Sequence, residues 1–157
     1  MLSIPTKLCY PKAMTKKSQY KINKVQTDSV KKKGKIFYNG VKPQAHEVAT
    51  LEVLAACGFD VELIVPTSTP KAKNPDILMM GTIWEIKAPM TTNAKTLKKR
   101  FHKASKQANR VIFDLRGVKH DYDKTKSIVI KMFEGNPEIR RMIIVPKSGN
   151  SILDFSK

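Results

Sequence analysis

The chain has 157 residues, of which 41% are hydrophobic, so it can build one domain with a real core and is not disordered as a whole. Its 30 Lys and Arg residues against 13 Asp and Glu give a formal charge of +17, which predicts a polyanionic partner: nucleic acid, an anionic membrane surface or an acidic protein. No apolar run is long enough for a transmembrane helix, and we expect no secretory signal, because the N-terminus lacks an apolar core.

Residues 1–40 differ in composition from the rest of the chain. They contain ten lysines but one acidic residue, Asp28, and little apolar periodicity. We interpret this segment as a mobile or loosely packed basic arm, which either contacts phosphates or is a solvated linker from a larger parent protein. The folded domain would then span residues 41–157. A disulfide between Cys9 and Cys57 stays open, but Cys57 follows an apolar helix pattern and is typical of a small core residue.

Apolar spacing from residue 41 onward predicts the element order α-β-β-β-α-β-α-β. Near-helical recurrence of Val48, Leu51 and Leu54, followed by Gly58, predicts the first helix. The predicted elements are helix 44–57, strand 60–65, loop 66–75, a β-hairpin centred on Gly81, helix 94–109, strand 110–115, helix 122–134 and strand 141–145. We therefore expect an α/β fold with a central mixed sheet of four or five strands flanked by helices.

The hairpin places charged side chains close together. If Met80 and Gly81 form a two-residue turn, Asp76 faces Glu85 across the two strands. Opposed residues of an antiparallel pair point to the same side of the sheet, and Lys87 shares that side with Glu85 because side chains alternate. The sequence thus predicts two carboxylates and one ammonium group at the open end of the hairpin.

Two like charges among apolar strand residues need a countercharge. Mg²⁺ or Mn²⁺ would supply it at Asp76 and Glu85, and Glu47, on the first helix, is expected to be a third ligand, directly or through water. Lys87 would orient a water or stabilise developing charge. The alternative is structural: an ion-paired sheet edge in which Asp76 is a turn residue and Glu47 complements the helix dipole.

A basic surface is predicted next to the hairpin. No acidic residue occurs between Asn93 and Arg110, and helix 94–109 is rich in lysine. We expect this helix and the preceding loop to bind phosphates, although a solvated charged face is the alternative. The expected nucleic-acid-binding residues are Lys71, Lys73, Lys95, Lys98, Lys99, Lys103, Lys106 and Gln107. Trp84 alternates to the opposite side from Glu85 and is expected in the core.

Pro75-Asp76 followed by Glu85-Ile86-Lys87, with Glu47 on the preceding helix, resembles the PD-(D/E)XK nuclease superfamily. The resemblance covers roughly residues 44–115. It implies a restriction-endonuclease-like core, in which Glu47, Asp76, Glu85 and Lys87 converge at a metal and hydrolyse phosphodiesters. If the substrate is RNA, its 2′-hydroxyl could attack instead, and the metal would be dispensable.

The stretches Asn74-Pro75-Asp76-Ile77, Trp84-Glu85-Ile86-Lys87 and Val111-Ile112-Phe113-Asp114-Leu115 resemble the C-terminal toxin domains of contact-dependent growth inhibition proteins and related polymorphic toxins. The resemblance implies a tRNA endonuclease that is part of a secreted or cell-surface bacterial toxin, acts in the cytoplasm of a competing bacterium and is neutralised by a cognate immunity protein, which we expect to be acidic. Two alternatives remain: a DNA endonuclease with the same site, and a non-catalytic nucleic-acid-binding module.

Overall fold

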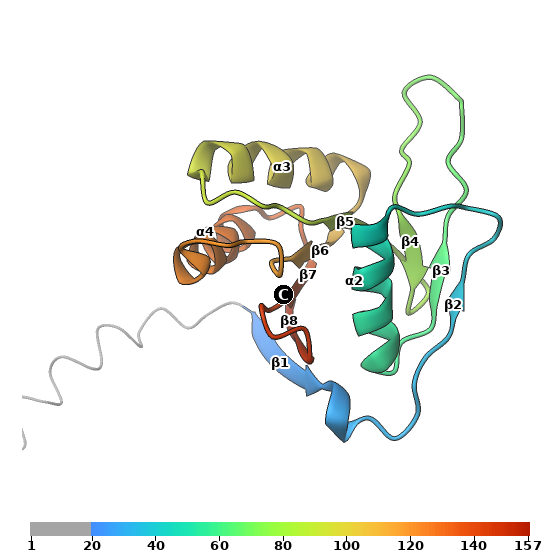
Figure 1. The fold of residues 1–157 in the computed structure, drawn as a ribbon. Helices are drawn as coiled ribbons and strands as arrows, with labels where there is room; N and C mark the ends of the chain where they lie inside the picture. Colours follow the sequence, from blue (N-terminus) through green and yellow to red (C-terminus); the bar gives the residue numbers. More distant parts are fainter. Residues whose placement is uncertain (1–19) are drawn as a thin grey trace, which may run out of the picture.

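A computed structural model describes residues 20–157 of the chain (Figure 1). It contains strands and helices in mixed order, together with a single-turn 3-10 helix, η1, at Thr27–Ser29. The strands are β1 (Lys21–Gln26), β2 (Ile36–Phe37), β3 (Val61–Leu63), β4 (Ile77–Met79), β5 (Thr82–Lys87), β6 (Arg110–Asp114), β7 (Arg141–Val145) and β8 (Ser151–Ser156). The longer helices are α2 (Ala45–Ala56), α3 (Ala94–Gln107) and α4 (Tyr122–Gly135).

All the described strands form one mixed sheet of eight strands, in the order β1-β8-β7-β6-β5-β4-β3-β2. The central strands β5, β6 and β7 are parallel, and β4 and β8 join them antiparallel on either side. The expected sheet of four or five strands was therefore too small. The predicted α/β class with a mixed central sheet is confirmed, as are the predicted helices, the hairpin and the strands β3, β6 and β7 to within two residues at each end.

The interpretation of residues 1–40 as an arm was wrong from residue 21 onward. β1 pairs antiparallel with β8, and β2 pairs parallel with β3, so both segments lie at edges of the sheet. The reason is that these edge strands are mostly exposed and carry few buried side chains, which removes the alternation that marks a strand. Residues 1–19, including Cys9, lie outside the described part of the chain.

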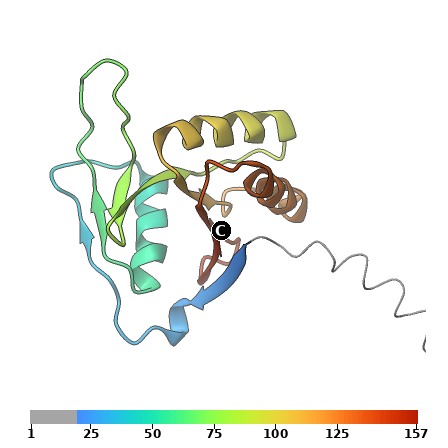
Figure 2. The ribbon, with the colours of Figure 1, turned by 180° about the vertical axis from the view of Figure 1, so that it is seen from behind.

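The helices cover the two faces of the sheet unequally. Helix α2 packs on one face with Trp84 and Ile86 of β5, whereas α3 and α4 pack on the other face with Val111 and Phe113 of β6. In Figure 1, α2 stands between the central strands and β4, β3 and β2, whereas α3 and α4 lie on the other side of the central strands; Figure 2 shows the same arrangement from behind. Consecutive residues of β5 therefore face different helices, and Glu85 and Lys87 face the α3 side.

The hairpin register is the predicted one near the turn. Met79 pairs with Thr82 and Leu78 with Ile83, around a two-residue turn at Met80 and Gly81. Both turn residues have positive φ, 53° and 71°, which is the conformation that matches the twist of a tight hairpin. Trp84 is fully buried, as expected, and its indole N–H donates to the Met79 carbonyl over 3.1 Å.

Candidate functional site

The candidate site lies where β4 ends and β5 continues. The last ladder pair of the hairpin is Ile77 with Trp84, so the predicted pairing of Asp76 with Glu85 is not formed. Instead, the Asp76 backbone N–H donates to the Trp84 carbonyl over 3.1 Å, and Asp76 Oδ2 accepts from the Ile86 N–H over 2.7 Å. Because β4 has stopped, the Ile86 N–H has no strand partner, and the Asp76 carboxylate takes that place at the strand edge.

Glu85 and Lys87 lie together on the face that α3 covers, as the alternation of side chains predicts. The Lys87 ammonium donates to Glu85 Oε1 over 2.6 Å, and the Glu85 side chain is almost fully buried while Lys87 is partly exposed. The second carboxylate oxygen, Glu85 Oε2, is buried and accepts no hydrogen bond from the described residues. A buried carboxylate oxygen without a donor is costly unless a proton or a cation reaches it.

The pKa values show that the two carboxyl groups interact. Burial raises the pKa of Glu85 to about 7; Lys87 opposes this rise, and the nearby Asp76 carboxylate adds to it. Burial also raises the pKa of Asp76, against the Ile86 N–H and Lys87, which lower it. Near neutral pH the pair therefore holds a proton more firmly than two exposed acids would.

The acidic pair offers two of the three ligands expected for a divalent cation. Glu85 Oε2 and the adjacent Asp76 carboxylate are hard oxygen ligands, and Lys87 is the one positive side chain near them in the described part of the chain. Both groups are therefore suitable ligands for Mg²⁺ or Mn²⁺. The third expected ligand does not join them. Within residues 20–157, no group of three or more His, Cys, Asp or Glu side chains is placed to hold a metal ion.

Glu47 is held elsewhere by the start of its helix. Its Oε2 accepts from the Gln44 backbone N–H over 2.7 Å, as half of a capping box that satisfies the N-terminus of α2. Glu47 and Asp76 nevertheless line the same pocket, of about 240 Å³, on the α2 side of the hairpin. The Glu47 charge also contributes to the raised pKa of Asp76. Glu47 thus borders the acidic pair without belonging to it.

The expected phosphate-binding lysines are exposed. They lie on the solvent side of α3, whose buried side consists of Leu97, Phe101 and Ala104, and on the loop between β3 and β4, which projects from the body of the molecule in Figures 1 and 2. The exposed set comprises Lys71, Lys73, Lys95, Lys98, Lys99, Lys103 and Lys106. Gln107 differs from them because its Oε1 accepts from the Asn74 backbone N–H over 2.8 Å and so joins α3 to this loop.

Asp114 is another buried carboxylate. The sequence analysis named it only as part of a stretch that resembles the toxin family and predicted no function for it. It accepts from the Thr50 hydroxyl over 2.6 Å and from the Arg116 guanidinium over 2.6 Å. Burial alone would raise its pKa, but the hydrogen bonds from Arg116 and Thr50 outweigh burial and lower it. Asp114 is fully partnered in this way and joins α2 to the end of β6, which is a structural role.

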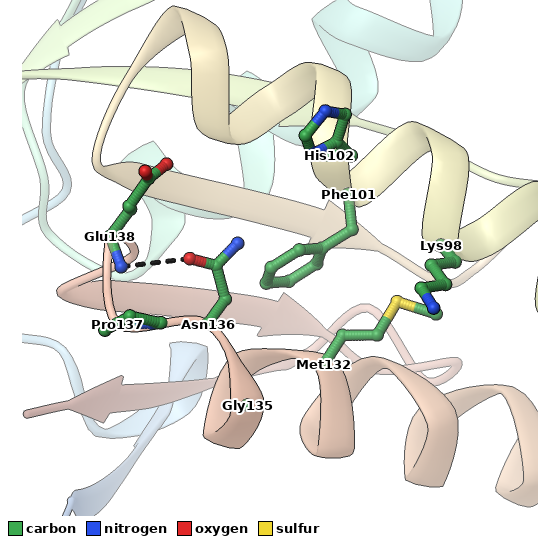
Figure 3. Close-up of a pocket in the computed structure, with 8 residues that line it drawn as sticks. All are labelled: Lys98, Phe101, His102, Met132, Gly135, Asn136, Pro137 and Glu138. Carbon is green, nitrogen blue, oxygen red and sulfur yellow. Dashed lines mark hydrogen bonds between the residues drawn. The ribbon is translucent and has the colours of Figure 1, made fainter.

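Two hollows flank the C-terminal half of α3. One, of about 840 Å³, lies between the hairpin and the end of α3 and is bordered by Ile83 and Arg110. The other, of about 410 Å³, lies between α3 and α4; in Figure 3, Phe101 points into it from α3 and Asn136 faces it from beyond α4. Glu138 lines both hollows. The sequence reasoning missed Ile83 and Arg110, although the alternation that groups Glu85 with Lys87 also includes Ile83.

None of the helices within residues 20–157 combines the length and the apolar character needed to span a bilayer.

The fold and the site define a mixed α/β domain in which the buried Glu85 and the half-buried Asp76 form an acidic pair at the free edge of a central strand. A family model for the contact-dependent growth inhibition CdiA C-terminal domain matches residues 73–151, and the chain belongs to this family. Its structure is similar to that of the CdiA-CT/CdiI toxin and immunity complex from Burkholderia pseudomallei, with a TM-score of 0.50 and 19% identity over 73% of this chain and 89% of that chain. At this identity the likeness concerns the fold. No curated protein matches the sequence.

Proposed function

We propose that the protein is a nuclease toxin domain whose active site is formed by Asp76, Glu85 and Lys87, with Glu47 assisting from the first turn of α2. The observation that carries this proposal is the buried, unpartnered Glu85 Oε2 beside the Asp76 carboxyl, with the Lys87 ammonium 2.6 Å from the other oxygen. A sheet edge built only for stability would pair both oxygens, as Asp114 does with Thr50 and Arg116.

Each residue of the site has a definite task in phosphodiester cleavage. Asp76 and Glu85 would hold Mg²⁺ or Mn²⁺, which, when bound, supplies Lewis acidity at the phosphate. Lys87 is partly exposed, so its ammonium can meet the negative charge that develops on the phosphate oxygens. With a pKa of about 7, Glu85 is partly protonated near neutral pH, and a bound cation would displace that proton and take the carboxylate as a ligand.

We further propose that the substrate is RNA, with tRNA as the first candidate, and that the domain acts in the cytoplasm of a target bacterium. The +17 charge and the exposed lysines of α3 support a polyanionic substrate. Membership of the CdiA C-terminal family supports a toxin that belongs to a contact-dependent growth inhibition protein. The structural relative from Burkholderia pseudomallei is a toxin and immunity complex, which supports an immunity partner for this chain, and the +17 charge supports an acidic one.

The experiment is incubation of the purified protein with bacterial tRNA and with plasmid DNA, each with Mg²⁺ and with EDTA. We expect cleavage of tRNA, no cleavage of the plasmid, and loss of cleavage in Glu85→Gln and in Lys87→Met. Glu52→Gln is a matched control, because Glu52 is an exposed glutamate on the same helix as Glu47 and lines a different hollow, which it shares with Arg116. Cleavage of tRNA that persists in EDTA would indicate attack by the RNA 2′-hydroxyl without a metal.

Two rival functions give different results in this experiment. A DNA endonuclease with the same site would cut the plasmid in the presence of Mg²⁺ and leave tRNA intact. A non-catalytic nucleic-acid-binding module would bind tRNA without cutting it, and Glu85→Gln would change nothing. Either result overturns the proposed function.

A further inference from the structure

We infer that the basin between the hairpin and the C-terminal end of α3 binds one unpaired nucleotide of the substrate, next to the nucleotide that is cut. The basin is the hollow of about 840 Å³ lined by Lys73, Leu78, Ile83, Lys106, Arg110 and Glu138, among others. The inference rests on the proposed function, because it assigns a second subsite to the same nuclease. It concerns recognition, and it can be tested by binding alone.

The position of the basin follows from the alternation along β5. Ile83, Glu85 and Lys87 point to the same face of the sheet, and Ile83 lines the basin while Glu85 belongs to the acidic pair. Residues two apart on a strand are separated by about 7 Å. A nucleic-acid strand with one phosphate at Glu85 and Lys87 therefore brings a neighbouring nucleotide over Ile83.

The floor of the basin is apolar although it faces solvent. Ile83 is 39% exposed and pairs across the hairpin with Leu78, which is half-buried, so both side chains offer hydrophobic surface that no helix covers. On the neighbouring strands β6, β7 and β8, residues of this face are instead packed under α3 and α4. A nucleobase laid flat on such a surface would bury apolar area on one side, as bases do when they are held against apolar side chains.

The rim of the basin is cationic. Lys73 comes from the loop before β4, Lys106 from the end of α3, and Arg110 from the start of β6. The ion pairs within residues 20–157 involve Lys87, Arg116 and Arg141, so these three rim cations have no carboxylate partner there. The Arg110 guanidinium makes one hydrogen bond, to Asn109 Oδ1 over 2.8 Å, and its remaining donors are available to a phosphate.

One carboxylate on the wall gives the basin a polar edge. Glu138 is exposed and lines both the basin and the pocket between α3 and α4 that Figure 3 shows. A carboxylate accepts hydrogen bonds from the exocyclic amino group of a base and repels a phosphate. The combination of a cationic rim, an apolar floor and one acceptor fits a nucleotide whose base is out of the stack. A duplex cannot present a base face in this way, since its bases remain stacked.

The test uses the Glu85→Gln protein, which is expected to bind without cutting, and a fluorescein-labelled single-stranded RNA and its duplex as probes in anisotropy titrations. We expect Ile83→Ala to weaken binding of the single strand roughly five- to tenfold and to leave binding of the duplex unchanged. We expect Arg110→Gln to weaken both and to reduce the slope of log K against log salt by about one.

Two exposed residues on β1, at the far edge of the sheet, provide matched controls. Ile22→Ala removes the same side chain from a site that is 57% exposed, and Lys24→Gln removes one exposed cation. Both should bind the single strand as the parent does. If Ile83→Ala binds the single-stranded RNA as tightly as Ile22→Ala does, the basin holds no nucleotide, and a protein partner becomes its expected occupant. The proposed function stands in that case. If the parent binds no RNA at all, the proposed function fails as well.

Discussion

Glu85 is the residue at which stability and chemistry conflict. Its side chain is almost completely buried, one of its oxygens has no donor, and Asp76 lies beside it. An apolar residue at this position, like the neighbouring Trp84 and Ile86, would stabilise the folded protein more than a buried carboxyl group does. The carboxyl group is therefore best explained by what it binds, and its titration should be visible in the stability of the protein.

We predict that the free energy of unfolding falls as the pH rises from 5 to 8 in the absence of metal. The pKa of Glu85 in the fold, about 7, lies above the value of 4.5 for an ordinary glutamate. Between these two values the folded protein binds more protons than the unfolded chain, so the stabilisation present at low pH is lost as the pH rises through 7. Urea denaturation in EDTA at four pH values measures this loss.

Glu85→Gln is the control for that titration, because the amide keeps the shape of the side chain but cannot ionise. Its stability should depend on pH less than that of the unmodified protein, and at pH 8 its melting temperature should be higher by at least a few degrees. Equal pH dependence in both proteins would show that Glu85 titrates as an exposed acid does.

At the scale of the element, the segments that carry the site could be predicted from the sequence. The spacing of Leu51 and Leu54, the glycine at the hairpin turn and the lysine pattern of residues 94–109 fix local structure without help from distant residues. The position of Asp76 could not be predicted in this way. It depends on β4 ending at Ile77, which leaves the Ile86 N–H to the aspartate side chain, and strand ends are set by tertiary packing.

The capping box of α2 allows the two possible roles of Glu47 to be separated. Glutamine can accept the same hydrogen bond from the Gln44 N–H, so Glu47→Gln should keep the stability of the fold, whereas Glu47→Ala should lose about 1 kcal/mol. We expect both variants to cleave RNA more slowly, because both remove the charge that borders Asp76. Thermal denaturation and cleavage rates check the two effects separately, and full activity in Glu47→Gln would leave Glu47 as a helix cap alone.

On the scale of the whole molecule, the sheet extends well beyond the elements that the sequence marks clearly. β1 is mostly exposed and lysine-containing, and β2 has two residues, so neither shows the alternation of a half-buried strand. Only the pairing of β1 with β8 and of β2 with β3 defines them. The partner strand of β1 lies more than 100 residues away in the chain and leaves no local signal, and β2 is too short to show one, so the charge of this region suggested an arm.

We predict that a fragment spanning residues 41–157 is much less stable than the full chain. Its loss of β1 would uncover the backbone edge of β8, and the side chains of Tyr20 and Val25 would no longer pack against the two cores. Circular dichroism during urea denaturation measures the difference. As a control, the full chain with Lys31, Lys32 and Lys33 all changed to Gln should fold normally and bind RNA more weakly, since it loses charge but keeps the strands. Equal stability of fragment and full chain would refute the structural role of β1.

The hydrogen bond from the Asn74 N–H to Gln107 Oε1 has one more consequence. It joins the last residue of the basic helix to the backbone two positions before Asp76, so we predict that contact of α3 with phosphates affects the acidic pair partly through this bond. Linkage requires that this communication work in both directions. If a cation binds the carboxylates, we therefore expect it also to change the affinity of the lysine-bearing helix for a nucleic-acid strand, and we expect Gln107→Ala to weaken this coupling.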